Sequence, residues 1–235
     1  MSLLYIGYYY DPTYVLVLIG FLLTLGASAL VKGTYAKYKK VGSLSGLTGA
    51  QAAERILRTA GLYDVRIGHI SGDLTDNYNP STKILSLSDT VYNSRSVAAI
   101  GVAAHECGHA IQHAQAYAPL RLRSAMVPAV NICSTLSWPV IVLGVVLSFN
   151  PTLLMIGIVL FAAAVLFSLV TLPVEFDASH RALKILDRSG MMEAKEVKMA
   201  GKVLRAAALT YVAAAASMIL QLLRLVLIFG GDRRK

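Results

Sequence analysis

Four stretches of the chain are long and apolar enough to cross a lipid bilayer. They cover Tyr14 to Val31, Met126 to Phe149, Thr152 to Leu172 and Ala206 to Phe229. Because a transmembrane helix needs about 20 consecutive apolar residues, the pattern predicts three or four membrane-spanning helices. The last stretch is interrupted by Gln221 and Arg224. It fits either a span or a helix lying partly in the membrane interface, and we expect a span.

Only Asn150 and Pro151 separate the second and third apolar stretches, which predicts a helical hairpin with an uncharged turn. Arg121 and Arg123 precede this hairpin, and a basic region from Arg181 to Arg205 follows it. Lysine and arginine are enriched in the cytoplasmic loops of membrane proteins. Both flanks of the hairpin are therefore expected in the cytosol, with the turn outside.

The first apolar stretch is predicted to be an uncleaved membrane anchor. Asp11 precedes it without any lysine or arginine, whereas four lysines follow it between Lys32 and Lys40. A cleaved signal peptide has the opposite order of charge. We therefore expect a protein of the cell (plasma) membrane with its N-terminus outside.

The segment from Gly42 to about Arg95 is the most polar part of the chain. Thr48 is a suitable N-cap for a helix from Gly49 to Ala60. Asp64 to Ile67 and Lys83 to Ser88 have the composition of short strands, with turn residues between them. The pattern predicts a small α+β region.

The following helix, capped by Asn93 or Ser94, is expected to reach about Tyr117. Its apolar part, Val97 to Ala104, is too short to span a bilayer and fits a helix in the core of a membrane-bound domain.

Composition agrees with a membrane protein. The chain is 56% hydrophobic and 15% charged, with a mean hydropathy of +0.60, which excludes an ordinary soluble domain. The net charge of +9 comes from basic residues beside the apolar stretches, without a basic stripe interleaved with aromatic residues. We therefore expect the lipid bilayer as a partner, and no nucleic acid.

The helix after the α+β region carries His105-Glu106-Cys107-Gly108-His109, which has the H-E-x-x-H spacing of zinc peptidases. Residues four apart share one face of a helix, so both imidazoles can reach a single Zn²⁺ ion. Glu106 then lies beside the metal, where it can accept a proton from the attacking water. The motif predicts a hydrolase with one Zn²⁺ per chain.

A catalytic zinc site generally has three protein ligands and one open position. Glu175 is the best candidate for the third ligand, because it follows the return of the hairpin to the cytosolic face and begins a predicted helix, Val174 to Leu186. A third histidine six residues after His109 is excluded, since that position is Gln115. His113 lies too far along the helix to join both histidines, and we expect it to line the cleft or to pair with a carboxylate.

Two stretches, HECGHAIQH from His105 and PVEFDAS from Pro173, resemble the YugP-type family of membrane zinc metallopeptidases. The likeness covers nearly the whole chain from Gly42. It implies a mainly α, integral membrane protein with a small α+β zincin-like (gluzincin) catalytic domain on the cytosolic face.

The chain is more distantly similar to HtpX- and Ste24-type peptidases, whose third ligand is the glutamate of a Glu-x-x-Ala-Asp pattern. Glu175 and Ala178 match this pattern, but Ser179 stands where the aspartate would be. Ser179 and Asp177 are both candidates for holding a histidine ligand. For the donor that stabilises the reaction's oxyanion, the candidates are Tyr211, Tyr78 and His113.

The expected function is zinc-dependent endopeptidase hydrolysis of membrane or membrane-proximal proteins. The exposed edge of the Lys83 to Ser88 strand is a candidate for aligning an extended substrate, beside its alternative as an ordinary sheet strand. Two other functions remain open: an intramembrane (site-2-type) protease, which needs the motif in a spanning helix, and a non-catalytic zinc-binding scaffold, which needs no base at Glu106.

The predicted organisation has five parts. They are an N-terminal anchor (1–32), a cytosolic α+β part with the H-E-x-x-H helix (33–125), a transmembrane hairpin (126–172), cytosolic helices with the third ligand (173–205), and a C-terminal apolar helix with a basic tail (206–235).

Overall fold

The computed structural model describes residues 11–230 and is mainly helical, as predicted. Its helices are α1 (Tyr14–Tyr38), α2 (Gly49–Thr59), α3 (Asp89–Tyr92), α4 (Val97–Ala114), α5 (Ala118–Val146), α6 (Pro151–Arg188) and α7 (Ala194–Phe229). Its strands are β1 (Arg66–Ile70), β2 (Asn77–Asn79) and β3 (Ile84–Ser88). The basic tail and the first ten residues of the predicted anchor lie outside the described range.

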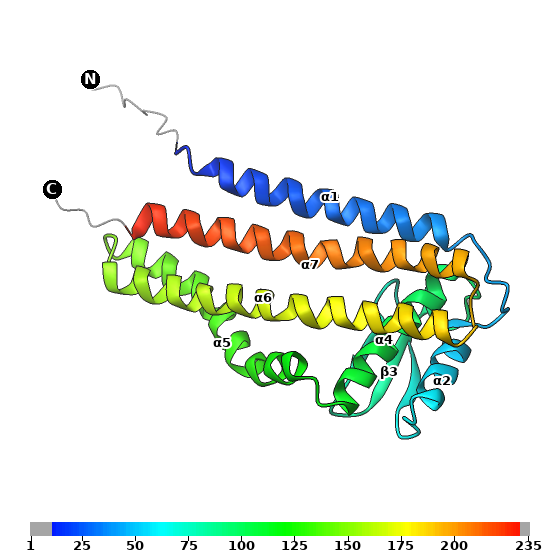
Figure 1. Ribbon diagram of the computed structural model, residues 1–235. Coiled ribbons are helices and arrows are strands. Elements are labelled where there is room, and N and C mark those ends of the chain that lie inside the picture. The colour runs from blue at the N-terminus through cyan, green and yellow to red at the C-terminus, as the bar shows by residue number, and fades with distance from the viewer. Residues whose placement is uncertain (1–10, 231–235) are drawn as a thin grey trace.

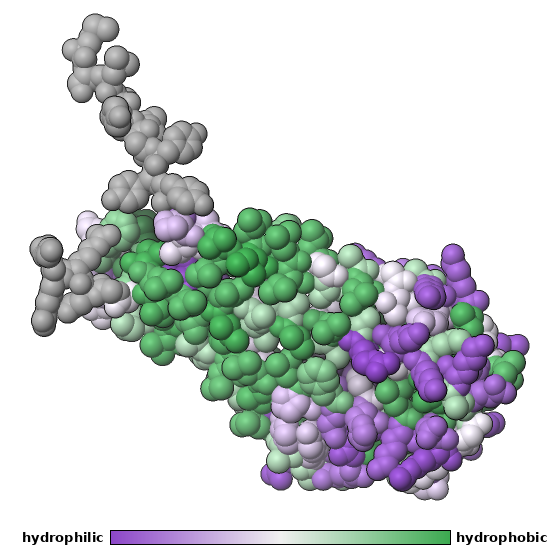
Figure 2. Space-filling view, turned by 45° about the horizontal axis from the view of Figure 1, so that its top comes forward, coloured by the Kyte–Doolittle hydropathy of each residue, from purple (hydrophilic) through white to green (hydrophobic). Residues whose placement is uncertain are grey.

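Four helices, α1, α5, α6 and α7, are long and apolar enough to cross a membrane. In Figure 1, α1, α6 and α7 run side by side, and the start of α1 and the end of α7 lie at the end of the bundle remote from α2, α4 and β3. On the face shown in Figure 2, apolar residues cover the helical bundle. Hydrophilic residues gather at the end of the molecule remote from the start of α1 and the end of α7. Large side chains such as Phe21, Ile132 and Val159 are more than half exposed on this bundle, as expected for lipid-facing positions.

The predicted turn of the hairpin is present between α5 and α6. The Asn150 side chain accepts hydrogen bonds from the backbone N–H groups of Thr152 and Leu153, and Pro151 occupies the first helical position. An asparagine cap followed by proline is a strong helix start, because proline lacks the N–H group that would otherwise be unpaired there.

The four long helices extend beyond their predicted apolar stretches: α1 continues to Tyr38 and α5 begins at Ala118, and the extensions of α6 and α7 bear on the site. The prediction of a separate helix from Val174 to Leu186 is wrong, because α6 continues through Pro173 without a break. Proline removes one backbone hydrogen bond, a loss that helices of membrane proteins tolerate when neighbouring groups pack around it. Likewise, α7 begins at Ala194, where Glu193 and Glu196 form a capping box, and not at Ala206. Both helices therefore reach from the apolar bundle into the polar end.

The sheet has the order β1-β3-β2, with β1 parallel and β2 antiparallel to β3. The strand β2 lies in a segment predicted as a loop, because its asparagines and the following proline are turn residues. Its pairing with β3 decides between the two alternatives left open for the Lys83–Ser88 strand: that strand is an ordinary central strand of the sheet and has no free edge. The exposed edge next to the H-E-x-x-H helix belongs to β2.

The main core surrounds α4, which lies against α2, β3, α6 and α7. The Ser96 side chain, and not Asn93 or Ser94, caps α4 by accepting a hydrogen bond from Ala99 N–H at 3.1 Å. Fully buried Val97, Ala99, Ile100 and Ala103 fix the first half of this helix, as its apolar pattern predicts. The core thereby holds the following turn, with both histidines, in one position.

Candidate active site

Two histidines of α4 form the centre of the site. Because they are one helical turn apart, the rings of His105 and His109 lie side by side with centroids 4.7 Å apart. One ligand atom from each of His105, Glu106 and His109 lies within 4.8 Å of the others, a grouping that can hold a metal ion. Helix α4 thus supplies two nitrogen donors and one carboxylate.

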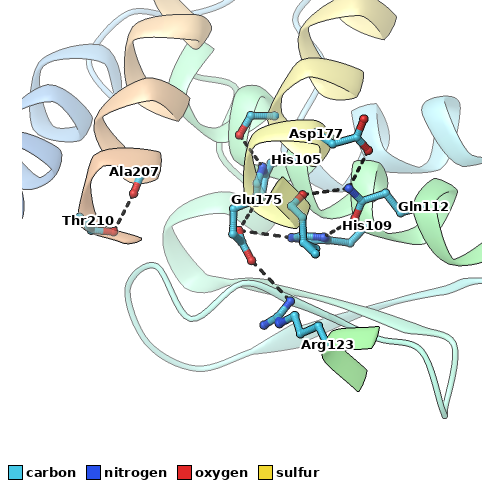
Figure 3. A network of polar contacts seen from close by, with 10 residues as sticks. His105, His109, Gln112, Arg123, Glu175, Asp177, Ala207 and Thr210 are labelled. Carbon is cyan, nitrogen blue, oxygen red and sulfur yellow. Dashed lines mark hydrogen bonds and ion pairs between the residues drawn. The ribbon is translucent and has the colours of Figure 1, made fainter. Parts of the chain in front are cut away.

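Glu175 reaches the same histidines from α6 (Figure 3). Its Oε2 atom lies 3.3 Å from His105 Nε2 and 3.6 Å from His109 Nε2. The Glu175 side chain is 3% exposed, and Oε2 has no hydrogen-bond partner among the described residues. A buried carboxylate oxygen is costly unless a cation or a hydrogen bond compensates it. The two Nε2 atoms and this oxygen therefore fit a shared Zn²⁺ ion, which accepts both donor types.

The other nitrogen of each imidazole is already engaged. Ser179 Oγ lies 3.1 Å from His105 Nδ1, and Gln112 Oε1 lies 3.1 Å from His109 Nδ1. Such contacts orient the rings and leave both Nε2 atoms directed at Glu175. Asp177 contacts neither histidine; it accepts a hydrogen bond from Gln112 Nε2 at 2.8 Å and so acts on His109 only through that amide.

Glu106 is buried, with 8% of its surface exposed. Burial raises the pKa of its carboxyl group above the ordinary glutamate value, while the nearby His105 and His109 oppose this shift. A carboxyl group whose pKa is moved towards neutrality is suited to accepting and returning a proton near pH 7.

The two middle residues of the motif, Cys107 and Gly108, pack α4 against α2 and α6. A Cβ atom on Gly108 would stand 2.5 Å from the backbone oxygen of Ala178, so only glycine allows α4 and α6 to approach this closely. Cys107 Sγ contacts the Ala53 carbonyl of α2 at 3.6 Å, away from the histidines. The close contact at Gly108 brings Glu175 within reach of α4.

An open cavity of about 380 Å³ lies in front of the histidines, and Tyr78 and Tyr211 line it together with Glu106 and Glu175. His113 is not among its lining residues. Instead, its Nδ1 lies 2.9 Å from the Tyr78 hydroxyl. Of the three predicted oxyanion donors, two therefore face the site, and His113 supports one of them.

Comparison with known proteins agrees with this geometry. Residues 13–230 match the family described as "Putative neutral zinc metallopeptidase". The chain belongs to this family. It is 47% identical over 211 residues to the "Putative membrane protease YugP" of Bacillus subtilis (strain 168), an alignment that covers 90% of this chain and 93% of that protein. No solved structure matches the chain.

Membership makes the chain a zinc metallopeptidase, a hydrolase that acts on proteins, and its H-E-x-x-H group is the one that can hold the metal. The similarity to a membrane protease agrees with the four candidate spans.

Two polar residues of this peptidase's site were not predicted. Arg123, interpreted from the sequence only as a cytosolic charge beside the hairpin, has Nη1 3.5 Å from Glu175 Oε1 and lines the open cavity. Gln112 is fully buried and joins His109, Asp177 and the Val174 carbonyl. Its position three residues after His109, on the same face of the helix, was the available signal.

Proposed function

We propose that the chain is a membrane-embedded zinc-dependent metalloendopeptidase in which His105, His109 and Glu175 bind one Zn²⁺ ion per chain. The observation that carries this proposal is the buried Glu175 Oε2, which lies at ion-pair distance, within 3.6 Å, from both imidazole Nε2 atoms and has no hydrogen bond among the described residues. Glu106, which follows the first histidine ligand in the chain, is not a metal ligand in this proposal and acts as the general base.

Bound zinc supplies Lewis acidity, which polarises the scissile carbonyl and lowers the pKa of the attacking water. The Glu106 carboxylate accepts a proton from that water and later returns it to the leaving amine nitrogen. Ser179 and Gln112 hold the two imidazole rings so that Nε2, and not Nδ1, faces the reacting group. Arg123 partly balances the charge of Glu175 from the side of the open cavity.

Tyr211 is the proposed oxyanion donor. It lines both cavities that border His105, Glu106 and Glu175, whereas Tyr78 lines only one of them. A hydroxyl donor directed at the carbonyl oxygen of the substrate strengthens its hydrogen bond as negative charge develops there.

The substrate is proposed to be an extended segment of a membrane-associated protein. The edge strand β2 borders the open cavity through Asn77 and Tyr78, so an extended peptide could pair with it and reach the histidines. Backbone pairing of this kind gives affinity without requiring one particular sequence.

The proposed orientation follows from charge and from the number of spans. With the four candidate helices all crossing a cell membrane, the start of α1 and the end of α7 lie at the outer face and the catalytic end lies in the cytosol. In this arrangement residues 33–125 and 173–205 form the cytosolic catalytic part, around the anchor, the hairpin and the C-terminal helix.

The two other functions have less support. An intramembrane protease needs its motif in a spanning helix, but α4 is not among the four candidate spans and is packed in the polar end. A scaffold that only binds zinc needs no buried carboxyl group beside the metal ligands, yet Glu106 occupies that position.

The test uses purified full-length protein in detergent, loaded with zinc, and casein as substrate. Wild-type protein is expected to cleave casein, whereas Glu106→Gln is expected to keep its zinc and lose cleavage by at least a hundredfold, since general-base catalysis contributes about 10²–10⁴-fold. Unchanged cleavage by the zinc-loaded Glu106→Gln variant would refute the mechanism.

A further inference from the structure

A second cavity borders the catalytic group on the side of the membrane helices. It has a volume of about 240 Å³ and touches His105, Glu106 and Glu175. Most of the other lining residues are apolar, and six of these come from α1, α4 and α7: Val31, Val102, Val203, Leu204, Ala207 and Ala208. Figure 3 shows the α7 turn with Ala207 and Thr210 across from His105 and Glu175.

The polar side chains of this wall are already satisfied within the protein. Tyr35 donates its hydroxyl hydrogen to the Thr90 carbonyl at 3.3 Å, and Thr210 donates to the Ala207 carbonyl at 2.6 Å. Asp76 accepts hydrogen bonds from the backbone and the hydroxyl of Ser88. Apart from the catalytic group and Tyr211, the wall therefore offers little to a polar ligand.

The two cavities beside the catalytic group differ in chemistry. Of the residues that line only one of them, those of the open cavity include the polar Asn77, Tyr78, Arg123 and Ser124, whereas those of the cavity beside α1 and α7 are mostly valine, leucine and alanine. A substrate crossing the catalytic group thus meets polar residues on one side and an apolar recess on the other.

We propose that the cavity between α1 and α7 is a specificity pocket that receives a large aliphatic or aromatic side chain of the substrate residue next to the cleaved bond. This inference rests on the proposed function. The pocket is larger than the roughly 150 Å³ apolar cavity that accommodates benzene in another protein, so a phenyl or isobutyl group fits. The small side chains of Ala207 and Ala208 leave this room.

The experiment is cleavage-site profiling with zinc-loaded, full-length protein in detergent and a peptide library of mixed sequence, read by mass spectrometry. Wild-type protein is expected to favour leucine, phenylalanine, isoleucine or methionine over alanine at one position next to the cleaved bond. The expected preference is at least tenfold, since one methylene in an apolar pocket changes specificity about 10–200-fold.

The diagnostic variant is Ala207→Phe, which fills the pocket from α7. It is expected to lose the preference for large residues at that position and to cleave beside alanine, glycine or serine instead. Val31→Phe fills the same pocket from α1 and is expected to give the same change. Ala214→Phe is the matched control, because Ala214 is exposed on α7, outside the pocket, and its profile should equal that of wild type.

If a variant with a filled pocket no longer cleaves peptides, a measurement of peptide binding still tests the pocket. In a Glu106→Gln background, a fluorescent peptide with one central leucine should bind at least tenfold more weakly to Ala207→Phe than to the otherwise unchanged chain. Peptides with alanine at that position should bind both equally.

The outcomes separate the two proposals. If wild type and Glu106→Gln cleave equally, or neither cleaves, the proposed function fails and the pocket fails with it. If only Glu106→Gln is inactive but the wild-type profile shows no apolar preference, the pocket alone is refuted. Unchanged profiles in both Ala207→Phe and Val31→Phe would also refute the pocket while leaving the peptidase mechanism intact.

Discussion

At the scale of single residues, the orientation of each imidazole depends on one neutral partner. Ser179 lies at His105 Nδ1, and Gln112 lies at His109 Nδ1. In the more distantly similar peptidases the position of Ser179 is an aspartate, whose charge would increase the basicity of the ring. A hydroxyl group at this place orients His105 with a weaker electrostatic contribution.

Ser179→Ala is therefore expected to weaken zinc binding or catalysis by about 10–100-fold, the usual effect of removing a group that orients a metal-ligating histidine. Ser179→Asp should retain tight zinc binding. The measurement is zinc affinity by competition with a chromophoric chelator. Ser168→Ala is the matched control on α6, because the Ser168 hydroxyl bonds only to the nearby Val165 carbonyl. Equal zinc affinity and activity in Ser179→Ala and Ser168→Ala would contradict the role given to Ser179.

The proposed metal ligands and the general base could be predicted from the sequence, whereas the residues that contact them could be predicted only in part. The H-E-x-x-H spacing is a local property, so it predicts that His105, Glu106 and His109 share a face before any tertiary structure is known. Glu175 could be chosen because the hairpin returns the chain to the same side. Arg123 could not, and neither could the contacts of Gln112 with α6, since these depend on how α5 and α6 meet α4 in space.

At the scale of elements, the site depends on how closely α4 and α6 approach. Gly108 faces the Ala178 backbone, and the next turns of α6 carry Glu175 and Ser179 on the same side. Because α6 runs unbroken through Pro173, its apolar part and its ligand-bearing part form one continuous helix.

Gly108→Ala would place a Cβ atom 2.5 Å from the Ala178 oxygen, and the two helices would have to separate. We expect a loss of about 1–3 kcal/mol of stability, typical of overpacking, together with weaker zinc binding. Gly26→Ala on α1, where nothing lies within 4 Å of the added atom, should affect neither property. Thermal unfolding in detergent and zinc content are the measurements. Normal zinc content and stability in Gly108→Ala would show that the close approach is not required.

Arg224 explains how a charged residue is accommodated in the last apolar helix. Its Nη2 lies 3.2 Å from Asp11 Oδ2, and its guanidinium group lies 4.3 Å from the centre of the Tyr14 ring. The contacts join the end of α7 to the beginning of α1, so Arg224, one of the two residues that made this span doubtful in sequence, ties it to its neighbour.

Arg224→Leu is expected to lower the midpoint of thermal unfolding in detergent, and Asp11→Asn is expected to lower it less, since the contact with Tyr14 remains. Lys202→Leu, at an exposed position of the same helix, is the control. A midpoint unchanged in Arg224→Leu would mean that this contact does not stabilise the pair of helices.

The elements themselves were predicted unevenly. Long apolar runs and the Asn150-Pro151 turn carry strong local signals, and the helices they predict are present. The strand β2 was missed because three residues with turn composition become a strand only by pairing with β3. The break predicted at Pro173 is absent because surrounding helices stabilise a continuous α6.

At the scale of the whole molecule, the site lies where the polar end meets the bundle of candidate spans. Helices α6 and α7 extend from one region into the other, and residues of α1, α6 and α7 border the cavity beside the catalytic group. In the proposed orientation, the catalytic group is open to the cytosol on one side and borders an apolar recess, formed partly by candidate membrane helices, on the other.

The proposed orientation predicts the positions of reporter fusions. Alkaline phosphatase, which is active only outside the cytosol, should be active when fused after residue 230 and inactive when inserted at residues 43–47. Activity at residues 43–47 would reverse the orientation. Activity at neither site would mean that α7 does not cross the membrane.

The central claim is that Glu175 binds the metal whereas Glu106 only transfers the proton. Zinc content per chain, measured by elemental analysis of wild-type, Glu175→Ala and Glu106→Gln proteins purified in parallel, tests it most directly. The account predicts about one zinc in wild type and in Glu106→Gln, and a large loss in Glu175→Ala. Full zinc content in Glu175→Ala, or its loss in Glu106→Gln, would contradict the account.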